Sequence, residues 1–251
     1  MALGTRTRLA ADAGRAAAAL SRRLGRGDGT VIGGRVSLLV DPGALARLAT
    51  GHRVSVVSGT NGKTTTTRLL AAALATAGPV VVNPQGSNLP PGLVAALAGA
   101  PAGAAAALEV DEAWLGAAAD ALEPATVTLL NLSRDQLDRV AEVRRLAERW
   151  RGVVARTGAR VVANADDPLV AWAASATEQV TWVAAGQPWT DDAAGCPSCG
   201  GRIVFGPAAW HCAGCGFARP APGFALDGEW LVGDGGEPHR IALGLPGRAN
   251  R

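Results

Sequence analysis

Residues 52–64 read His-Arg-Val-Ser-Val-Val-Ser-Gly-Thr-Asn-Gly-Lys-Thr. Residues 52–58 have the pattern of a buried strand, and the helical pattern of Lys63–Ala77 follows directly after the glycine-rich turn. A strand that leads through such a turn into a helix directs backbone N–H groups and the helix N-terminus toward one point, which suits a polyphosphate. The stretch therefore predicts a phosphate-binding loop at Gly59–Thr64 and a site for ATP with Mg²⁺.

The loop assigns a role to each of its polar residues. In such a loop the lysine reaches the terminal phosphates, and the hydroxyl that follows it joins the magnesium shell. These roles fall to Lys63 and Thr64, and Thr65 is expected to face the nucleotide as well. Lys63 is the only lysine of the 251 residues, so it marks a place where a compact ammonium is needed rather than the planar fork of arginine. The remaining predicted ATP contacts in the loop are Gly59, Thr60, Asn61 and Gly62.

Strand and helix patterns alternate after the loop. Further strands are expected at Pro79–Asn83, Ala105–Val110, Thr126–Leu132, Arg160–Ala163 and Val180–Ala184, and a helix at Ala141–Thr157. This alternation predicts an α/β fold, a mostly parallel sheet with helices on both faces, whose ligands collect at the carboxyl ends of the strands. Strand character is predicted again at Phe224–Leu231 and Arg240–Leu245.

The first 42 residues are expected to form an amphipathic basic helix over residues 1–26 and a short extended segment at Val31–Val40. The basic helix either touches a membrane surface or an anionic headgroup, or is a solvated helix face. A net charge of +3 spread along the chain provides no focused field for nucleic acid. No apolar run approaches the ~20 residues of a membrane span, and no cleaved signal is predicted.

Two C-x-x-C knuckles, Cys196–Cys199 and Cys212–Cys215, stand 12 residues apart, and glycines 200 and 216 follow their second cysteines. Two such pairs of thiolates are typical of a zinc ribbon, here inserted at residues 190–222. Because all four ligands are cysteines, the zinc is expected to be structural. Disulfides and a redox pair are disfavoured alternatives, since ATP chemistry indicates a reducing cytosol and a redox pair does not require two matched knuckles. The charge balance of the insert argues against nucleic-acid binding.

The loop after its strand resembles the Mur ligase superfamily, the ATP-dependent Mur ligases and folylpolyglutamate synthases, which activate a carboxylate as an acyl phosphate and join it to an amine. Three later segments are similar to segments of that family. Leu108–Glu112 resembles its acidic magnesium-binding segment, Asn131–Arg139 its N-x-x-x-D-H-x-D segment, and Asn164–Pro168 the segment that contacts the nucleoside.

The resemblance implies a set of site residues beyond the loop. Glu109 is the implied magnesium ligand and, with Lys63, the implied catalytic residue, whereas Asp111, Glu112 and Asp138 remain open as surface charges. The further ATP contacts that it implies are Asn131, Asn164 and Asp167. Asn88 is expected near the substrate or the phosphates, and a role in loop packing is the alternative.

Gln136 stands where the ligases carry histidine. This departure and the four-cysteine insert both resemble the MurT-type branch, the synthetase subunits of lipid II isoglutaminyl synthase. That resemblance implies peptidoglycan biosynthesis: ATP activates the α-carboxylate of D-glutamate in the lipid II stem peptide, and a GatD-type glutaminase partner supplies ammonia. It also implies a cytoplasmic protein that acts at the inner face of the membrane.

The expected domains are an N-terminal segment at 1–42, a Mur ligase-like central domain at 43–245 that contains the ribbon, and at 246–251 the start of a linker to a C-terminal domain. We therefore expect a truncated chain that binds nucleotide but turns over poorly. Two other functional classes stay open at this point, an amino-acid-adding ligase and a nucleotide-binding module for protein contacts.

Overall fold

The computed structural model describes residues 3–84, 86–133, 140–186, 190, 193–206, 209–233 and 235–241. The chain divides into two compact units. The first comprises Met1–Ser58 and Lys63–Val127, and the second Gly59–Gly62 and Thr128–Arg251. The boundary falls within the phosphate loop, so the loop residues before Lys63 pack with the later part of the chain.

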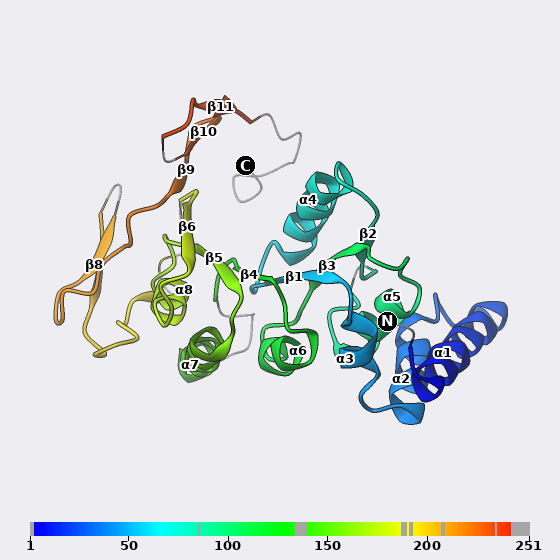
Figure 1. Ribbon diagram of the computed structural model, residues 1–251. Coiled ribbons are helices and arrows are strands. Elements are labelled where there is room, and N and C mark those ends of the chain that lie inside the picture. Colours follow the sequence, from blue (N-terminus) through cyan, green and yellow to red (C-terminus); the bar gives the residue numbers. More distant parts are fainter. Residues whose placement is uncertain are drawn as a thin grey trace. The chain divides into compact units, whose positions relative to one another are not determined.

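The first unit is built on three parallel strands in the order β1-β3-β2, which are β1 (Arg53–Ser58), β3 (Ala105–Glu109) and β2 (Val80–Val82). The helix α4 (Lys63–Ala75) covers one face and α6 (Leu115–Leu122) the other (Figure 1). β1 is buried from its second residue onward, and Val54, Val56 and Val57 are part of the hydrophobic core. The predicted strands and the parallel arrangement are confirmed here.

Four further helices complete this unit: α1 (Thr5–Arg23), α2 (Thr30–Val40), α3 (Ala44–Ala49) and α5 (Pro90–Ala98). The basic helix predicted at the N-terminus is confirmed as α1. The extended segment predicted at Val31–Val40 is wrong, because these residues form α2.

Close packing explains the error at α2. A Cβ built on Gly34 would run into the carbonyl of Pro91 on α5, and one built on Gly14 of α1 would run into Ser37 of α2. The Ser37 hydroxyl also donates a hydrogen bond of 3.0 Å to the carbonyl of Ala10. Because α2 presents small residues to two neighbouring helices, tertiary packing outweighs the strand propensity of its valines and isoleucine.

The second unit carries the strand order β4-β5-β6-β9-β10-β11, in which β4 (Thr126–Leu129) begins at the boundary of the units. The other strands are β5 (Arg160–Asn164), β6 (Val180–Ala184), β9 (Phe224–Asp227), β10 (Trp230–Gly233) and β11 (His239–Arg240). β5, β6 and β9 run parallel, and β10 and β11 add an antiparallel edge. The helices α7 (Val140–Arg156) and α8 (Pro168–Ala174) lie side by side against this sheet (Figure 1).

The single strand predicted at Phe224–Leu231 is wrong, because the chain reverses within it. Gly228 adopts a φ of 59°, which lets β9 and β10 pair as a hairpin. Of the strand predicted at Arg240–Leu245, the structure shows β11 at its start, and residues 242–251 lie outside the described part of the chain.

The four-cysteine insert holds the two remaining strands, β7 (Ile203–Phe205) and β8 (Trp210–Cys212), which pair antiparallel. Within the described ranges, no helix combines the length and apolar character that a membrane crossing requires.

Candidate functional site

Glu109 ends β3 and is held in place by Asn83. The Glu109 N–H donates to Asn83 Oδ1 at 2.8 Å, and Asn83 Nδ2 donates to the Glu109 carbonyl at 2.9 Å. Glu109 is only 6% exposed. Its carboxylate accepts a hydrogen bond from the Thr64 hydroxyl at 2.7 Å and another from the Asn88 side-chain amide at 3.5 Å. The structure therefore brings together Thr64, Glu109 and Asn88, which the sequence placed in one site.

The oxygens of Thr64 and Glu109 suit a shared magnesium ion. Mg²⁺ takes oxygen ligands at about 2.0–2.1 Å in octahedral geometry, which puts neighbouring ligand oxygens about 3 Å apart. The separation of 2.7 Å between Thr64 Oγ1 and Glu109 Oε2 is close to this value. Both groups are hard oxygen donors, so these residues fit the ion.

Lys63 lies on the first turn of α4 and donates from Nζ to Glu112 Oε2 at 3.1 Å. Both side chains are largely buried, with 13% and 18% of their surfaces exposed. The sequence left Glu112 open as a surface charge. Glu112 stands three residues after Glu109, just beyond the carboxyl end of the same strand, and this position indicates a side chain near the ligand site. Thr65 is half-buried beside Thr64 on the same turn.

In the second unit, Asn131 shapes the loop Gly59–Gly62. The Thr60 N–H donates to the Asn131 carbonyl at 2.9 Å, and the Asn61 N–H donates to Asn131 Oδ1 at 2.9 Å. Asn131 Nδ2 in turn donates to the Asn61 carbonyl at 3.0 Å. Ser133 adds hydrogen bonds to the side chains of Thr60 and Asn61. Asn131 therefore acts on the loop itself, a contact for which the sequence offered no signal.

The segment Asn164–Asp167 follows β5 and is tied by its own side chains. Asn164 Oδ1 accepts the N–H of Asp166 at 2.8 Å. Asp167 is the N-cap of α8, where Oδ1 accepts two backbone N–H groups of the first turn, and its Oδ2 accepts the N–H of Leu132 at 2.8 Å. Asp167 is fully buried. Its predicted role as an ATP contact stays a prediction, but the geometry shows a carboxylate that organises backbone.

Several predicted features lie outside the described residues. They are residues 134–139, with Asp135, Gln136 and Asp138, and residues 242–251, which contain the expected linker.

The four cysteines form one cluster. Their Sγ atoms all lie within 4.8 Å of one another, with 3.7 Å between Cys196 and Cys215 and 3.5 Å between Cys199 and Cys212. Tetrahedral zinc with Zn–S bonds of about 2.3 Å requires sulfurs about 3.8 Å apart. The donor set and its spacing therefore fit a closed, structural zinc site.

The backbone around the cluster supports thiolates. The Gly201 N–H donates to Cys199 Sγ at 3.3 Å, and the Gly214 N–H donates to Cys212 Sγ at 3.3 Å. The backbone N–H groups of Cys215 and Gly214 lower the pKa of Cys212 to about 6, which favours its thiolate at neutral pH. Burial instead raises the pKa of Cys196. The sequence singled out glycines 200 and 216 for tight turns, and both have positive φ, 77° and 74°.

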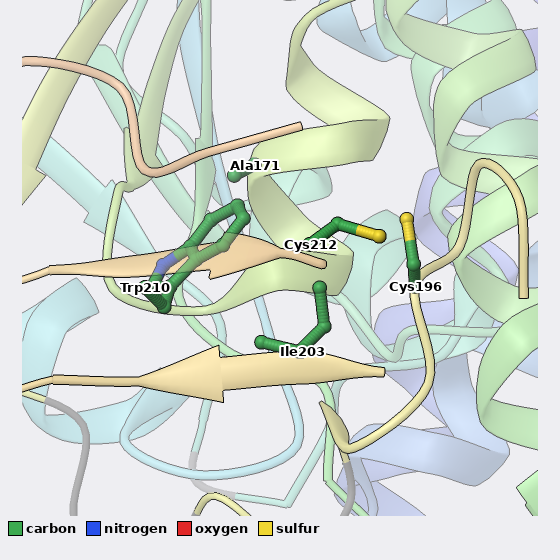
Figure 2. Packing of buried hydrophobic residues seen from close by; sticks show 5 residues of the cluster. All are labelled: Ala171, Cys196, Ile203, Trp210 and Cys212. Carbon is green, nitrogen blue, oxygen red and sulfur yellow. The ribbon is translucent and has the colours of Figure 1, made fainter. Parts of the chain in front are cut away.

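Within the second unit, the ribbon packs against α8 through a small apolar core (Figure 2). Ile203, Trp210 and two of the cysteines meet Ala171 of α8, and the sulfurs of Cys196 and Cys212 point toward the same place (Figure 2). Trp210 is 2% exposed, and its ring centroid lies 5.2 Å from that of Phe217. The ribbon is therefore anchored beside the segment that follows β5.

Comparison with known proteins matches residues 57–192 to the Mur ligase middle domain. The chain is 34% identical over 173 residues to the lipid II isoglutaminyl synthase (glutamine-hydrolyzing) subunit MurT of Streptococcus pneumoniae, covering 66% of this chain and 38% of that protein. It is 28% identical over 216 residues to the same-named subunit of Staphylococcus aureus strain N315, covering 79% and 49%. The chain thus spans about half or less of the length of these curated relatives.

Among solved structures, the pseudomurein peptide ligase type C from Methanothermus fervidus is similar with a TM-score of 0.57 at 18% identity. The similarity covers 80% of this chain and 44% of that one. At this identity the likeness supports the α/β fold and carries no conclusion about substrate.

Proposed function

Since this chain belongs to the Mur ligase family, as the match of residues 57–192 to its middle domain shows, we propose that it is the ATP-binding part of a lipid II isoglutaminyl synthase. The name is that of its curated relatives. The proposed reaction is the ATP-dependent amidation of a carboxylate, which is a step of peptidoglycan biosynthesis.

The reaction has two steps. An oxygen of the D-glutamate α-carboxylate attacks the γ-phosphorus of ATP, the bond to the bridging oxygen breaks, and ADP leaves. The nitrogen of ammonia then attacks the acyl carbon, phosphate leaves, and nitrogen loses a proton to give the amide. The first step brings anions together, so its barrier falls mainly through positioning and neutralisation of charge on the phosphoryl group.

The observation that carries this proposal is the contact between Thr64 and Glu109, next to Lys63 at the start of α4. Thr64 and Glu109 would hold Mg²⁺, which when bound would neutralise phosphate charge. Lys63 supplies a mobile cation for the terminal phosphates, and Asn88 orients the Glu109 carboxylate from its other oxygen. The backbone amides of Gly59–Gly62, which directly precede Lys63 in the chain, are expected to donate to the phosphates.

Ammonia comes from a glutaminase partner of the GatD type. The relatives' name includes glutamine hydrolysis, and it calls MurT a subunit. The residues matched here amount to less than half of each relative. We therefore expect residues 1–251 alone to bind nucleotide and to turn over poorly.

Because the proposed substrate is lipid-linked and the reaction uses cytosolic ATP, we expect the reaction to take place at the cytoplasmic face of the membrane. The helix α1 suits this location, because Leu9 and Leu20 are 61% and 58% exposed on a helix that carries several arginines. Leu9 and Leu20 stand 11 residues apart, which places them on the same side of an α-helix. Exposed leucines on one side of a helix that also carries arginines are the pattern expected of an interfacial helix.

The full-length protein with its glutaminase partner, lipid II, glutamine and ATP provides the test. We expect isoglutamine in the stem peptide and one ADP released for each amide formed. A folded, zinc-loaded complex that binds ATP and yields no amidated lipid II would refute the proposal. Incorporation of an added amino acid instead of ammonia would identify an amino-acid-adding ligase.

A further inference from the structure

The ribbon makes two polar contacts with the segment that follows β5. Trp210 Nε1 donates to the carbonyl of Ala165 at 3.0 Å, and Arg219 Nε donates to Asp166 Oδ1 at 2.6 Å. The side chains of Arg219 and Asp166 are only 18% and 9% exposed, so this ion pair is shielded from water. Both contacts come from the part of the insert that the cysteine cluster holds together.

The segment that follows β5 makes further hydrogen bonds through Asp166 and Asp167. The second oxygen of Asp166 accepts the N–H groups of Ala185 and Gly186 at 2.9 Å and 2.7 Å, so the carboxylate is fixed on both sides. The next residue, Asp167, accepts the Leu132 N–H at 2.8 Å. The position of Leu132 therefore depends on a turn that the ribbon buttresses.

Leu132 adjoins the residue that shapes the phosphate loop. Asn131 exchanges hydrogen bonds with the backbone of Asn61 in both directions, and its carbonyl accepts the Thr60 N–H. An unbroken series of contacts thus runs from the cysteine cluster through Trp210 and Arg219 to the loop. All of its members belong to the second unit.

We propose that the metal-held ribbon is a support for the phosphate loop, and that Trp210 and Arg219 are positioning residues for nucleotide binding. The inference rests on the proposed function in one respect, namely that Gly59–Thr64 binds ATP. A loop held in its binding conformation loses less conformational entropy when the ligand arrives, so the support increases affinity without touching the ligand.

The test measures the loop and the nucleotide separately, in the whole chain. Amide hydrogen exchange is followed at Thr60, Asn61 and Leu132 without nucleotide, ATP affinity is measured by calorimetry with Mg²⁺, and zinc content is measured for every variant. Trp210→Phe puts a smaller aromatic ring in place of the buried indole and removes the N–H donor. Arg219→Ala removes the ion pair, Arg219→Lys retains its charge, and Arg202→Ala is the matched control, an exposed arginine of the same ribbon.

We expect Trp210→Phe and Arg219→Ala to keep their zinc, to exchange the three amides about tenfold faster, and to bind ATP about tenfold more weakly, as for loss of one buried hydrogen bond. Arg219→Lys should recover part of both effects, and Arg202→Ala should match the parent. If Arg219→Ala loses zinc, the exchange and affinity of Trp210→Phe decide between the two outcomes. Unchanged exchange in zinc-loaded Trp210→Phe overturns the proposal, as does unchanged exchange in Arg219→Ala when that variant keeps its zinc.

The same measurements distinguish a failure of the proposed function from a failure of this inference. A parent chain that does not bind ATP contradicts the nucleotide site, while the exchange measurements still report whether the ribbon supports the loop.

Discussion

The ammonium nitrogen of Lys63 lies 3.1 Å from Oε2 of Glu112, and both side chains are largely buried. We propose that Lys63 also contacts the terminal phosphates of ATP, as the lysine of a phosphate-binding loop does. On this proposal the same ammonium serves both the carboxylate of Glu112 and the bound nucleotide. When ATP binds, this ion pair is expected to exchange for a phosphate contact.

The exchange predicts opposite effects for the two partners. Glu112→Gln removes the competing charge, so ATP affinity is expected to rise about two- to fivefold, the worth of a partly screened ion pair. Lys63→Ala removes a charged donor and is expected to weaken ATP binding by at least about tenfold. Calorimetry measures both, with Asp111→Asn as the neighbouring acidic control. A loss of affinity in Glu112→Gln as large as that in Lys63→Ala would instead make Glu112 part of the nucleotide site.

Glu109→Gln tests the magnesium site. The amide keeps the shape of the side chain and an acceptor for the Thr64 hydroxyl, but it loses the negative charge that Mg²⁺ prefers. We expect ATP affinity to fall about tenfold or more with Mg²⁺ present and to change little with EDTA. Glu148→Gln, which removes an exposed carboxylate on α7, should behave as the parent in both buffers. Equal losses in the two buffers would assign Glu109 a role without metal.

The cysteine cluster predicts one tightly bound zinc ion for each chain. Loss of one thiolate opens the site, and because metal binding is coupled to folding, Cys199→Ser is expected to lose zinc and to lower Tm by roughly 10 °C. Metal analysis and a thermal melt measure the two effects. Ser198→Ala changes the adjacent exposed residue of the same knuckle and should leave both unaltered. A Cys199→Ser protein with the parent's zinc content and Tm would contradict a four-cysteine site.

Helix packing in the first unit predicts a cost at Gly34. An added Cβ meets the backbone carbonyl of Pro91, which cannot move aside as a side chain would. Gly34→Ala is expected to destabilise the protein by about 1–3 kcal/mol, the usual cost of overpacking. Denaturant unfolding measures it against Gly4→Ala, whose Cβ would meet nothing within 4 Å. Equal stability of the two variants would show that α2 does not pack on α5 as described.

The proposed location predicts binding to anionic vesicles. Residues 1–251 should sediment with phosphatidylglycerol vesicles more than with phosphatidylcholine vesicles, and less so as salt increases, because arginines contribute through charge. Leu20→Asp should weaken the binding. The control is Leu69→Asp, which changes an exposed leucine of α4. Equal binding by both variants would mean that the leucines of α1 do not contact the lipid.

Prediction from the sequence succeeded where the signal was local. β1, the loop and α4 follow one another without a gap, so their order alone implies backbone amides and a helix N-terminus at one point. The pairing of Thr64 with Glu109 was also within reach, because parallel strands present their carboxyl ends at one edge. It failed at α2, where contacts with α1 and α5 outweigh local propensity, and at Gly228, where one residue reverses the chain.

The sequence by itself determined the strand–loop–helix unit and the two cysteine knuckles, and it predicted the residues offered to phosphate and magnesium, because each depends on spacings of a few residues. Only the tertiary structure decided that Glu112 pairs with Lys63, that Asn131 clamps Asn61, and that Arg219 holds Asp166. These partners stand 49, 70 and 53 residues apart. No local pattern encodes such contacts, because they exist only after the packing of the whole unit brings the side chains together.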